Sequence, residues 1–254
     1  MCSANDPVAV LTRAQLEAVR RSRRHPSILQ FDYLHLRYLN RDLARALAGV
    51  AGPVRDVLDV WCGSRPYEDL LPASAQCTGL DVEDNPYGVA DVVSNELLPF
   101  EDESFDLVTC IEAFQLVPDP VDAVREFRRV LRPGGTVLVA LPFAFEYSLE
   151  SFECRYTEHE LRALFDGWDQ VEVRENGGRV VAWTVLTGSI LAATEQRAGR
   201  RRSLRLLLRP MFLAGYALLN GVGFLLAKVE ERKAARAVAF PMNLLLTARR
   251  PIDV

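Results

Sequence analysis

The sequence predicts an α/β protein built on a mostly parallel, doubly wound sheet. Short apolar runs that end at a glycine or an acidic residue alternate with amphipathic runs, as strands and helices do when they follow one another. The length of 254 residues suits one such domain with additions. Ligands of these sheets bind at the carboxyl ends of the strands, so residues that follow strands are the first candidates for a site.

Residues 1–49 are predicted to form a helical lid over the site. The pattern divides residues 12–48 into two helices, of which the first ends at His25-Pro26. The second ends at Gly49, a residue type favoured just past a helix end. His35 lies among aromatic residues in this second helix, which makes it a candidate for facing the substrate.

Seven strands and two further helices are expected along the chain. Residues 120–132 and 157–165 have helical spacing, and Thr157 and Glu160 stand three apart, as in a capping box. The order predicts a Rossmann-like, seven-stranded sheet with a core at 50–177 and a final strand within 241–254. The strands are expected at 54–63, 77–82, 90–93, 105–114, 134–143, 168–175 and 243–251.

A helical insertion of about sixty residues, 178–240, separates the last two strands, which usually join by a short hairpin. Its segment 211–227 has 17 residues without a charge, the lower limit for a membrane-spanning helix. If 243–251 pairs in the same sheet, a single crossing would place that strand on the wrong side of the membrane. A re-entrant or in-plane helix, a helical hairpin or a buried interface remain as alternatives.

Charge is divided unevenly along the chain. From 186 to 254 there are 12 Lys or Arg and 4 Asp or Glu, while the whole chain has a net charge of −4, so the remainder carries about −12. Basic residues beside an apolar helix suit an anionic membrane surface. Self-association or a protein partner through 180–236 is the alternative, with plain core packing third. The basic residues meant are Arg200, Arg201, Arg202, Arg205 and Arg209.

The composition predicts a globular, cytoplasmic protein. The insertion suggests an alternative, in which the protein is bound peripherally at the membrane. The first twenty residues have no basic segment followed by an apolar run, so no signal peptide is expected. The five cysteines have no paired or metal-type spacing, so we expect reduced thiols and no metal. Nucleic acid is not expected as a partner, because no aromatic residues are interleaved with the basic cluster.

Four segments of the chain match a known pattern in order. They are VLDVWCG (57–63), GLDVED (79–84), LPFEDESFDLVTCIEAFQLVPDP (98–120) and REFRRVLRPGGTVLVALP (125–142). Together they resemble the class I S-adenosylmethionine-dependent methyltransferases, in particular the methyltransferase type 11-like domain family. The resemblance spans about half the chain, from 54 to 176. It implies S-adenosylmethionine as cofactor and transfer of a methyl group to a small-molecule, lipid-linked or glycan-linked acceptor.

The resemblance also implies which residues contact the cofactor. Asp59 and the turn ending at Cys62-Gly63 would hold its methionine part, and Asp81 would accept hydrogen bonds from both ribose hydroxyls. Asn95 stands where the family often has an aspartate for the adenine amino group, and an amide oxygen can accept the same bond. The predicted cofactor-binding residues are Asp59, Trp61, Cys62, Gly63, Asp81, Val82, Asn95, Glu96 and Ile111.

The acceptor side is expected along the fourth strand and the loop after the fifth. Glu112, His35 and Tyr147 are the predicted catalytic residues, and Arg155, Tyr156 and Glu146 are the predicted substrate-binding residues. Methyl transfer from a sulfonium depends mainly on proximity and orientation. A base is needed only where the acceptor must first lose a proton.

Two positions depart from the family pattern. Trp61 replaces the first glycine of G-C-G, so its indole either fills part of the cofactor pocket or swings out and changes the backbone. Gln115-Leu116 replaces the frequent Glu-His, which removes the usual general base. These departures keep a second function open: a methyltransferase-like protein that does not methylate and serves as a scaffold, a regulatory partner or a repurposed biosynthetic catalyst.

Overall fold

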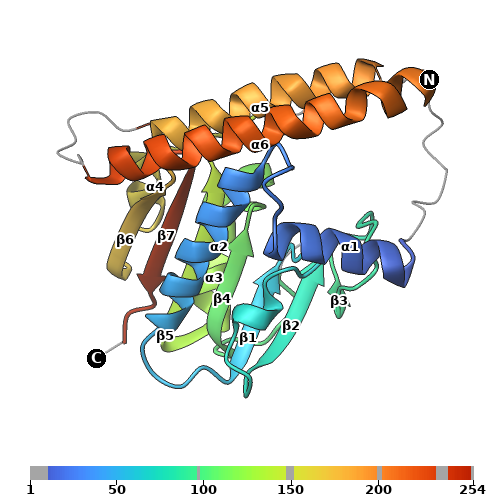
Figure 1. Cartoon of the computed structure of the whole chain (residues 1–254). Helices are drawn as coiled ribbons and strands as arrows, with labels where there is room; N and C mark the ends of the chain where they lie inside the picture. Colours follow the sequence, from blue (N-terminus) through green and yellow to red (C-terminus); the bar gives the residue numbers. More distant parts are fainter. Residues whose placement is uncertain (1–10, 96–97, 147–151, 199–201, 233–239, 253–254) are drawn as a thin grey trace.

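The computed structural model describes residues 11–95, 98–146, 152–198, 202–232 and 240–252, although side chains are described only from 207 onward in the fourth of these ranges. It contains one seven-stranded sheet in the order β3-β2-β1-β4-β5-β7-β6 (Figure 1). Of these strands, β7 runs antiparallel to both of its neighbours and the other pairings are parallel, which confirms the predicted fold class. The strands are β1 (Asp56–Val60), β2 (Gln76–Asp81), β3 (Val92–Val93), β4 (Phe105–Ile111), β5 (Leu131–Pro142), β6 (Asp169–Asn176) and β7 (Asn243–Arg249).

The helices begin where the sequence offers caps. Thr12 and Gln15 form a capping box at the start of the first helix, and Thr157 and Glu160 form the predicted one at the start of the fourth. The helices are α1 (Arg13–Arg24), α2 (Tyr33–Ala48), α3 (Pro120–Val130), α4 (Glu158–Leu164), α5 (Arg179–Ala198) and α6 (Arg202–Arg232). Two short 3₁₀ turns, η1 (Glu68–Leu70) and η2 (Phe114–Leu116), follow β1 and β4.

Helices cover both faces of the sheet. Leu39 and Leu43 of α2 pack against Leu138 of β5 on one face, and Phe127 of α3 lies in the cluster on the other. All of these side chains are fully buried or nearly so. The second of the two predicted lid helices is therefore also part of the body of the domain.

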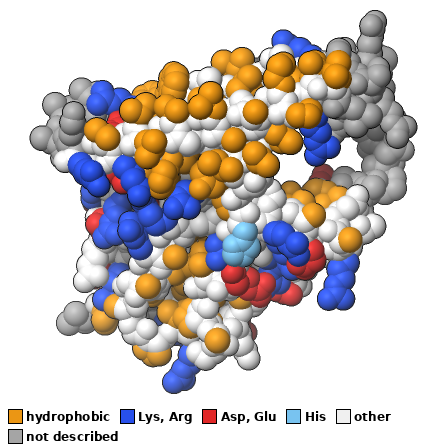
Figure 2. Space-filling model, viewed as in Figure 1, with side chains coloured by type: hydrophobic (Ala, Val, Ile, Leu, Met, Phe, Trp, Pro, Cys, Tyr) orange, Lys and Arg blue, Asp and Glu red, His pale blue; other side chains and the backbone are white. Residues whose placement is uncertain are grey.

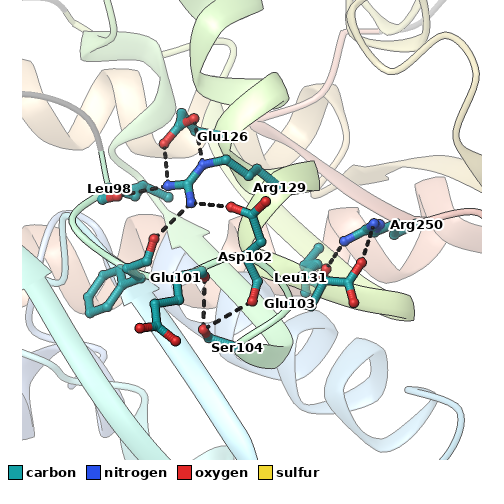
Figure 3. A network of polar contacts seen from close by, with 10 residues as sticks. Leu98, Glu101, Asp102, Glu103, Ser104, Glu126, Arg129, Leu131 and Arg250 are labelled. Atoms are coloured by element: carbon teal, nitrogen blue, oxygen red, sulfur yellow. Dashed lines mark hydrogen bonds and ion pairs between the residues drawn. The ribbon is translucent and has the colours of Figure 1, made fainter.

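Arg129 of α3 explains why the long segment after β3 has a fixed shape (Figure 3). Its guanidinium donates to the carbonyl oxygens of Leu98 (2.9 Å) and Phe100 (2.7 Å), and it also binds the carboxylates of Asp102 and Glu126. A planar cation with five donors can satisfy several oxygens at once. The segment that leads into β4 is thereby tied to α3, and both run toward the same edge of the sheet.

The predicted insertion forms a helical hairpin, α5 and α6, between β6 and β7. It lies across the carboxyl ends of the parallel strands (Figure 1), where Val181 and Val185 of α5 pack with Leu34 of α2 and with Ala144, just after β5. Gly188 allows this packing, because a Cβ there would lie 2.9 Å from the carbonyl oxygen of Phe31. Among the described residues one helix, from Leu207 to Arg232, is long and apolar enough to cross a membrane by length and composition.

Candidate active site

A cavity of about 990 Å³ opens at the carboxyl ends of β1, β2 and β4. Its described lining contains seven carboxylates and one cationic side chain, that of Arg23. Such a lining attracts cations, because the charges of one sign add in a recessed site. The carboxylates are those of Asp59, Asp81, Asp84, Glu112, Asp119, Asp122 and Glu126.

The turn after β1 has the backbone of a glycine-rich turn. Gly63 has a φ of +56°, and a Cβ added there would meet only a Tyr87 ring carbon, at 4.0 Å. The Gly63 N–H donates to Oδ2 of Asp81 over 2.7 Å, and Asp81 Oδ1 accepts from the Val82 N–H over 2.8 Å. The side chain of Asn85 also donates to Asp81. The buried carboxylate at the end of β2 therefore fixes the turn, which leaves room for a ligand against its backbone.

Trp61 has a left-handed backbone conformation, which glycine adopts most readily. Its φ is +54°, in the left-handed region that few non-glycine residues occupy. The indole lines the cavity and packs edge-on against Phe127, with 6.3 Å between the ring centroids. The turn thus keeps its left-handed backbone, and the indole forms part of the cavity wall beside α3.

Asp59 is the acidic residue next to the carboxyl end of β1. Its Oδ1 accepts a hydrogen bond from the Thr109 hydroxyl over 2.7 Å. Burial raises the pKa of Asp59 to about 6, and this effect outweighs the opposing effects of the Thr109 hydrogen bond and the nearby Arg65 cation. The carboxyl group is thus poised to change its charge just below neutral pH.

The other predicted cofactor residues border the same cavity, except one outside the described residues. Cys62, Val82, Asn95 and Ile111 all line the cavity. The amide oxygen of Asn95 accepts from the Glu83 N–H over 3.1 Å, so this side chain also holds the loop after β2. Glu96 lies outside the described residues.

Glu112 joins the end of β4 to both N-terminal helices. It has a φ of +56° and lines the cavity. Its carboxylate forms an ion pair with Arg23 of α1, and its Oε1 lies 2.6 Å from Nε2 of His35 in α2. Burial alone would raise the pKa of Glu112, but His35 and Arg23 outweigh burial and lower it to about 2. The group is therefore an anion that fastens the lid to the sheet.

The predicted substrate-binding residues lie around the loop after β5, next to the hairpin and outside the cavity lining. Glu146 accepts a hydrogen bond from Ser189 of α5 over 2.7 Å, and Arg155 pairs with Glu153 over 2.9 Å. The ring of Tyr156 is buried against Phe114, with 5.7 Å between centroids. Tyr147, a predicted catalytic residue, lies outside the described residues.

Several lining residues are not among those predicted from the sequence, including Arg23, Tyr67 and four of the seven carboxylates. Arg23 Nη2 donates to the Tyr67 hydroxyl over 3.1 Å and reaches Glu112 from the same nitrogen. Arg23 is one of several arginines at the end of α1, and Tyr67 lies between β1 and η1, outside the motifs that carry the resemblance. Among the described residues, no group of three or more His, Cys, Asp or Glu side chains is placed to hold a metal ion.

Comparison with known proteins agrees with this fold and site. Residues 58–139 match the family described as "Methyltransferase domain". The match covers β1 through most of β5 and includes the turn after β1, Asp81 and Glu112. The predicted resemblance to the class I methyltransferases is thereby confirmed for this segment, and S-adenosylmethionine is the cofactor of that family.

Individual relatives are similar over part of their length. The ubiquinone biosynthesis O-methyltransferase of Pseudomonas paraeruginosa is 32% identical over 108 residues, 37% of this chain and 46% of the relative. Its counterpart from Nitrosospira multiformis is 36% identical over 119 residues, 41% of this chain and 47% of the relative. The chain thus spans about half the length of the curated relatives it matches.

Two solved structures share the fold over most of the chain. The [4+2]-cyclase SpnF has a TM-score of 0.55 and 21% identity, over 87% of this chain and 83% of its own. A protein of Galdieria sulphuraria described as a sarcosine dimethylglycine methyltransferase has a TM-score of 0.52 and 16% identity, over 86% and 89%. At these identities the similarity shows the fold alone.

Proposed function

We propose that this protein is an S-adenosylmethionine-dependent methyltransferase of biosynthesis that acts in the cytoplasm on a small-molecule or a lipid- or glycan-linked acceptor. The observation that carries the proposal is the glycine turn held by Asp81 at the mouth of a cavity with seven carboxylates. The cofactor is a sulfonium cation with a second positive charge on its amino group. An acidic cavity with an open backbone turn suits both features.

The described residues divide the cavity into a cofactor side and an acceptor side. Asp59 and the Gly63 backbone would hold the methionine end of the cofactor, Asp81 its ribose and Asn95 its adenine. Once bound, the cofactor supplies an electrophilic methyl group for in-line transfer. The chain's contribution is to align the acceptor with that methyl group, which provides most of the acceleration in such displacements.

Glu112 would act by position rather than as the base. A carboxylate with a pKa of about 2 accepts protons poorly at neutral pH. It holds Arg23 at the cavity wall and His35 behind it, so the acceptor would meet a fixed guanidinium that can bind an anionic or polar group. We infer that Tyr147, Glu146 and Arg155 complete the acceptor side from the loop after β5, with Tyr156 packed behind that loop.

Titration calorimetry of the purified protein with S-adenosylmethionine tests the proposal. We expect saturable binding at micromolar to sub-millimolar concentration, followed by methyl transfer in an acceptor screen with labelled cofactor. The left-handed Trp61 supports one alternative, a methyltransferase-like protein without methylation. No binding up to millimolar cofactor, with binding restored by Trp61→Gly, would contradict the proposal and favour that alternative.

Cofactor affinity should fall as the pH falls through about 6. Because burial raises the pKa of Asp59 to about 6, its carboxylate is ionised at pH 7.5 and mostly protonated at pH 5. The protonated form no longer attracts the cofactor's amino group, so the dissociation constant should rise roughly tenfold between these pH values. Titrations at both pH values measure this change. If the dissociation constant of Asp59→Asn rose by the same factor between these pH values, another group would be responsible for the pH dependence.

A further inference from the structure

The outward side of α6 is an uninterrupted apolar surface. From Leu207 to Val229 most of its exposed large apolar residues are three, four or seven positions apart, which places them on one side of the helix. We call these residues the outer stripe, and each is between 43% and 75% exposed. They are Leu207, Met211, Leu218, Val222, Leu225 and Val229.

The opposite side of α6 is the one that packs on the domain. Phe212, Tyr216, Asn220 and Ala227 are buried there, roughly half a turn away from the outer stripe. A helix buried on one side in a soluble domain is usually polar on the other. Here both sides are apolar, and the space-filling view shows hydrophobic side chains spread along the whole hairpin (Figure 2).

Cations lie at both ends of this apolar surface. Arg197 and Arg209 are exposed at one end, and Lys228 and Arg232 are exposed at the other. Arg232 follows Val229 by three residues and so lies on the same side of the helix as the outer stripe. From Gln196 to Val229 the sequence contains no Asp or Glu. Arg200 and Arg201 lie outside the described residues, and the side chains of Arg202 and Arg205 are not described either.

The hairpin is fastened along the domain and does not project from it. At its base, Glu230 Oε2 accepts a hydrogen bond from the Val180 N–H over 3.1 Å. In the middle of α6, Asn220 Nδ2 donates to the carbonyl oxygens of Ile28 (2.8 Å) and Gln30 (2.7 Å) in the loop between α1 and α2. The strands that precede and follow the hairpin, β6 and β7, belong to the same sheet. The part of α6 from Leu207 to Arg232 is thus an in-plane element of about 39 Å rather than a crossing one.

We propose that the outer stripe of α6 docks on the surface of an anionic lipid bilayer. An apolar stripe bounded by Arg and Lys is the composition that such surfaces bind, with the apolar side chains at the acyl boundary and the cations at the headgroups. A second copy of this chain fits less well. Two stripes laid against each other would bring cationic ends together, and the acidic residues nearest those ends, Glu195, Glu230 and Glu231, are already bound within the chain by Tyr216, Arg179 and Arg41.

Docking in this orientation brings the active site to the lipid. The hairpin crosses the same edge of the sheet at which the cavity opens. Ile28 and Leu29, in the loop that Asn220 holds on the domain side of α6, are also exposed, and this loop leads from α1, which carries Arg23, to α2. If the proposed function holds, the acceptor is a molecule that resides in the bilayer.

Co-sedimentation of the full-length protein with vesicles tests docking without cofactor or acceptor, so its outcome is independent of methyl transfer. We expect pelleting with phosphatidylcholine–phosphatidylglycerol vesicles and much less with phosphatidylcholine alone. Leu218→Asp should reduce the bound fraction roughly tenfold or more, because a charge replaces an apolar side chain at the lipid boundary. Leu218 is 70% exposed, so the variant should keep the melting temperature of the parent.

Val121→Asp is the matched control. Val121 is an exposed apolar residue of α3, and the substitution changes the net charge by the same amount. The control should bind vesicles like the parent protein. Equal loss in both variants, or no pelleting of the parent with anionic vesicles, would overturn the proposal. So would a dimer of the parent in sedimentation velocity that Leu218→Asp converts to a monomer, because the stripe would then belong to a second copy.

Discussion

Replacing Asp81 by alanine should weaken S-adenosylmethionine binding by at least roughly a hundredfold. The Asp81 carboxylate accepts hydrogen bonds from the N–H groups of Gly63 and Val82, and it is only 6% exposed. Its removal would leave the Gly63 turn without its partner and would remove the two charge-assisted bonds that we propose it forms with the ribose. Each bond of that type contributes about 1.5–3 kcal/mol. Titration calorimetry at pH 7.5 measures the change.

Asn95→Ala provides the comparison for this effect. Its amide oxygen accepts one bond from the Glu83 backbone, and the expected contact with the adenine is a single neutral bond. The dissociation constant should rise about tenfold or less. If Asp81→Ala changed the affinity no more than Asn95→Ala does, Asp81 would not be the residue that binds the ribose.

Glu112→Gln should destabilise the protein by about 2 kcal/mol and loosen the first helix. The substitution leaves Arg23 with its charge but without its carboxylate, and removing one partner of a largely buried pair is costly. For a chain of this size the melting temperature should fall by roughly 4–8 °C. Hydrogen exchange of the α1 amides should accelerate more than that of the amides in β4. Methyl transfer should fall more than cofactor affinity does, because we propose that Glu112 holds Arg23 on the acceptor side of the cavity.

The pH dependence gives this prediction a second readout. The pKa of Glu112 is about 2 in the folded protein, below its ordinary value of 4.5, so its stabilisation is present above pH 4.5 and disappears as the pH falls toward 2. The parent and Glu112→Gln should therefore differ by a constant amount from pH 5 to 7.5 and converge below pH 4.5. Asp69→Asn, which breaks the exposed pair with Arg24 on the same helix, should change stability by about 1 kcal/mol or less. An equal effect of both substitutions would show that Glu112 has no special role in holding the lid.

The fold was predictable because its signals are local. Each strand of the core is a short apolar run that ends at a turn residue, and Thr157 with Glu160 marked a helix start that the structure reproduces. The insertion was recognisable by its length, and its two helices follow from apolar runs too long for strands. The structure adds the packing of the hairpin on the lid loop through Asn220, a contact between residues 190 or more positions apart.

Residues of the site were predictable from the sequence only where they stand at the ends of strands. Asp59, Asp81 and Glu112 stand at strand ends, and parallel strands bring such ends together. Arg23 gave no comparable signal, because the end of α1 contains several arginines and its partner Glu112 is 89 residues away. The pKa of about 2 at Glu112 was also not predictable from the sequence, since it depends on contacts with Arg23 of α1 and His35 of α2.

The antiparallel pairing of β7 has a consequence for the order in which this chain can fold during synthesis. Asn176 and Asn243 face each other in the sheet, joined by a side-chain hydrogen bond of 2.8 Å, although 67 positions separate them. Among the described strands, β6 reaches the sheet through β7, which lies between it and β5. A ribosome that adds 5–20 residues per second needs about 3–13 s to make the intervening chain. Until β7 has been made, β5 and β6 both expose unpaired edges, and the apolar hairpin leaves the ribosome before β7 does, so chaperones or lipid can meet the hairpin first.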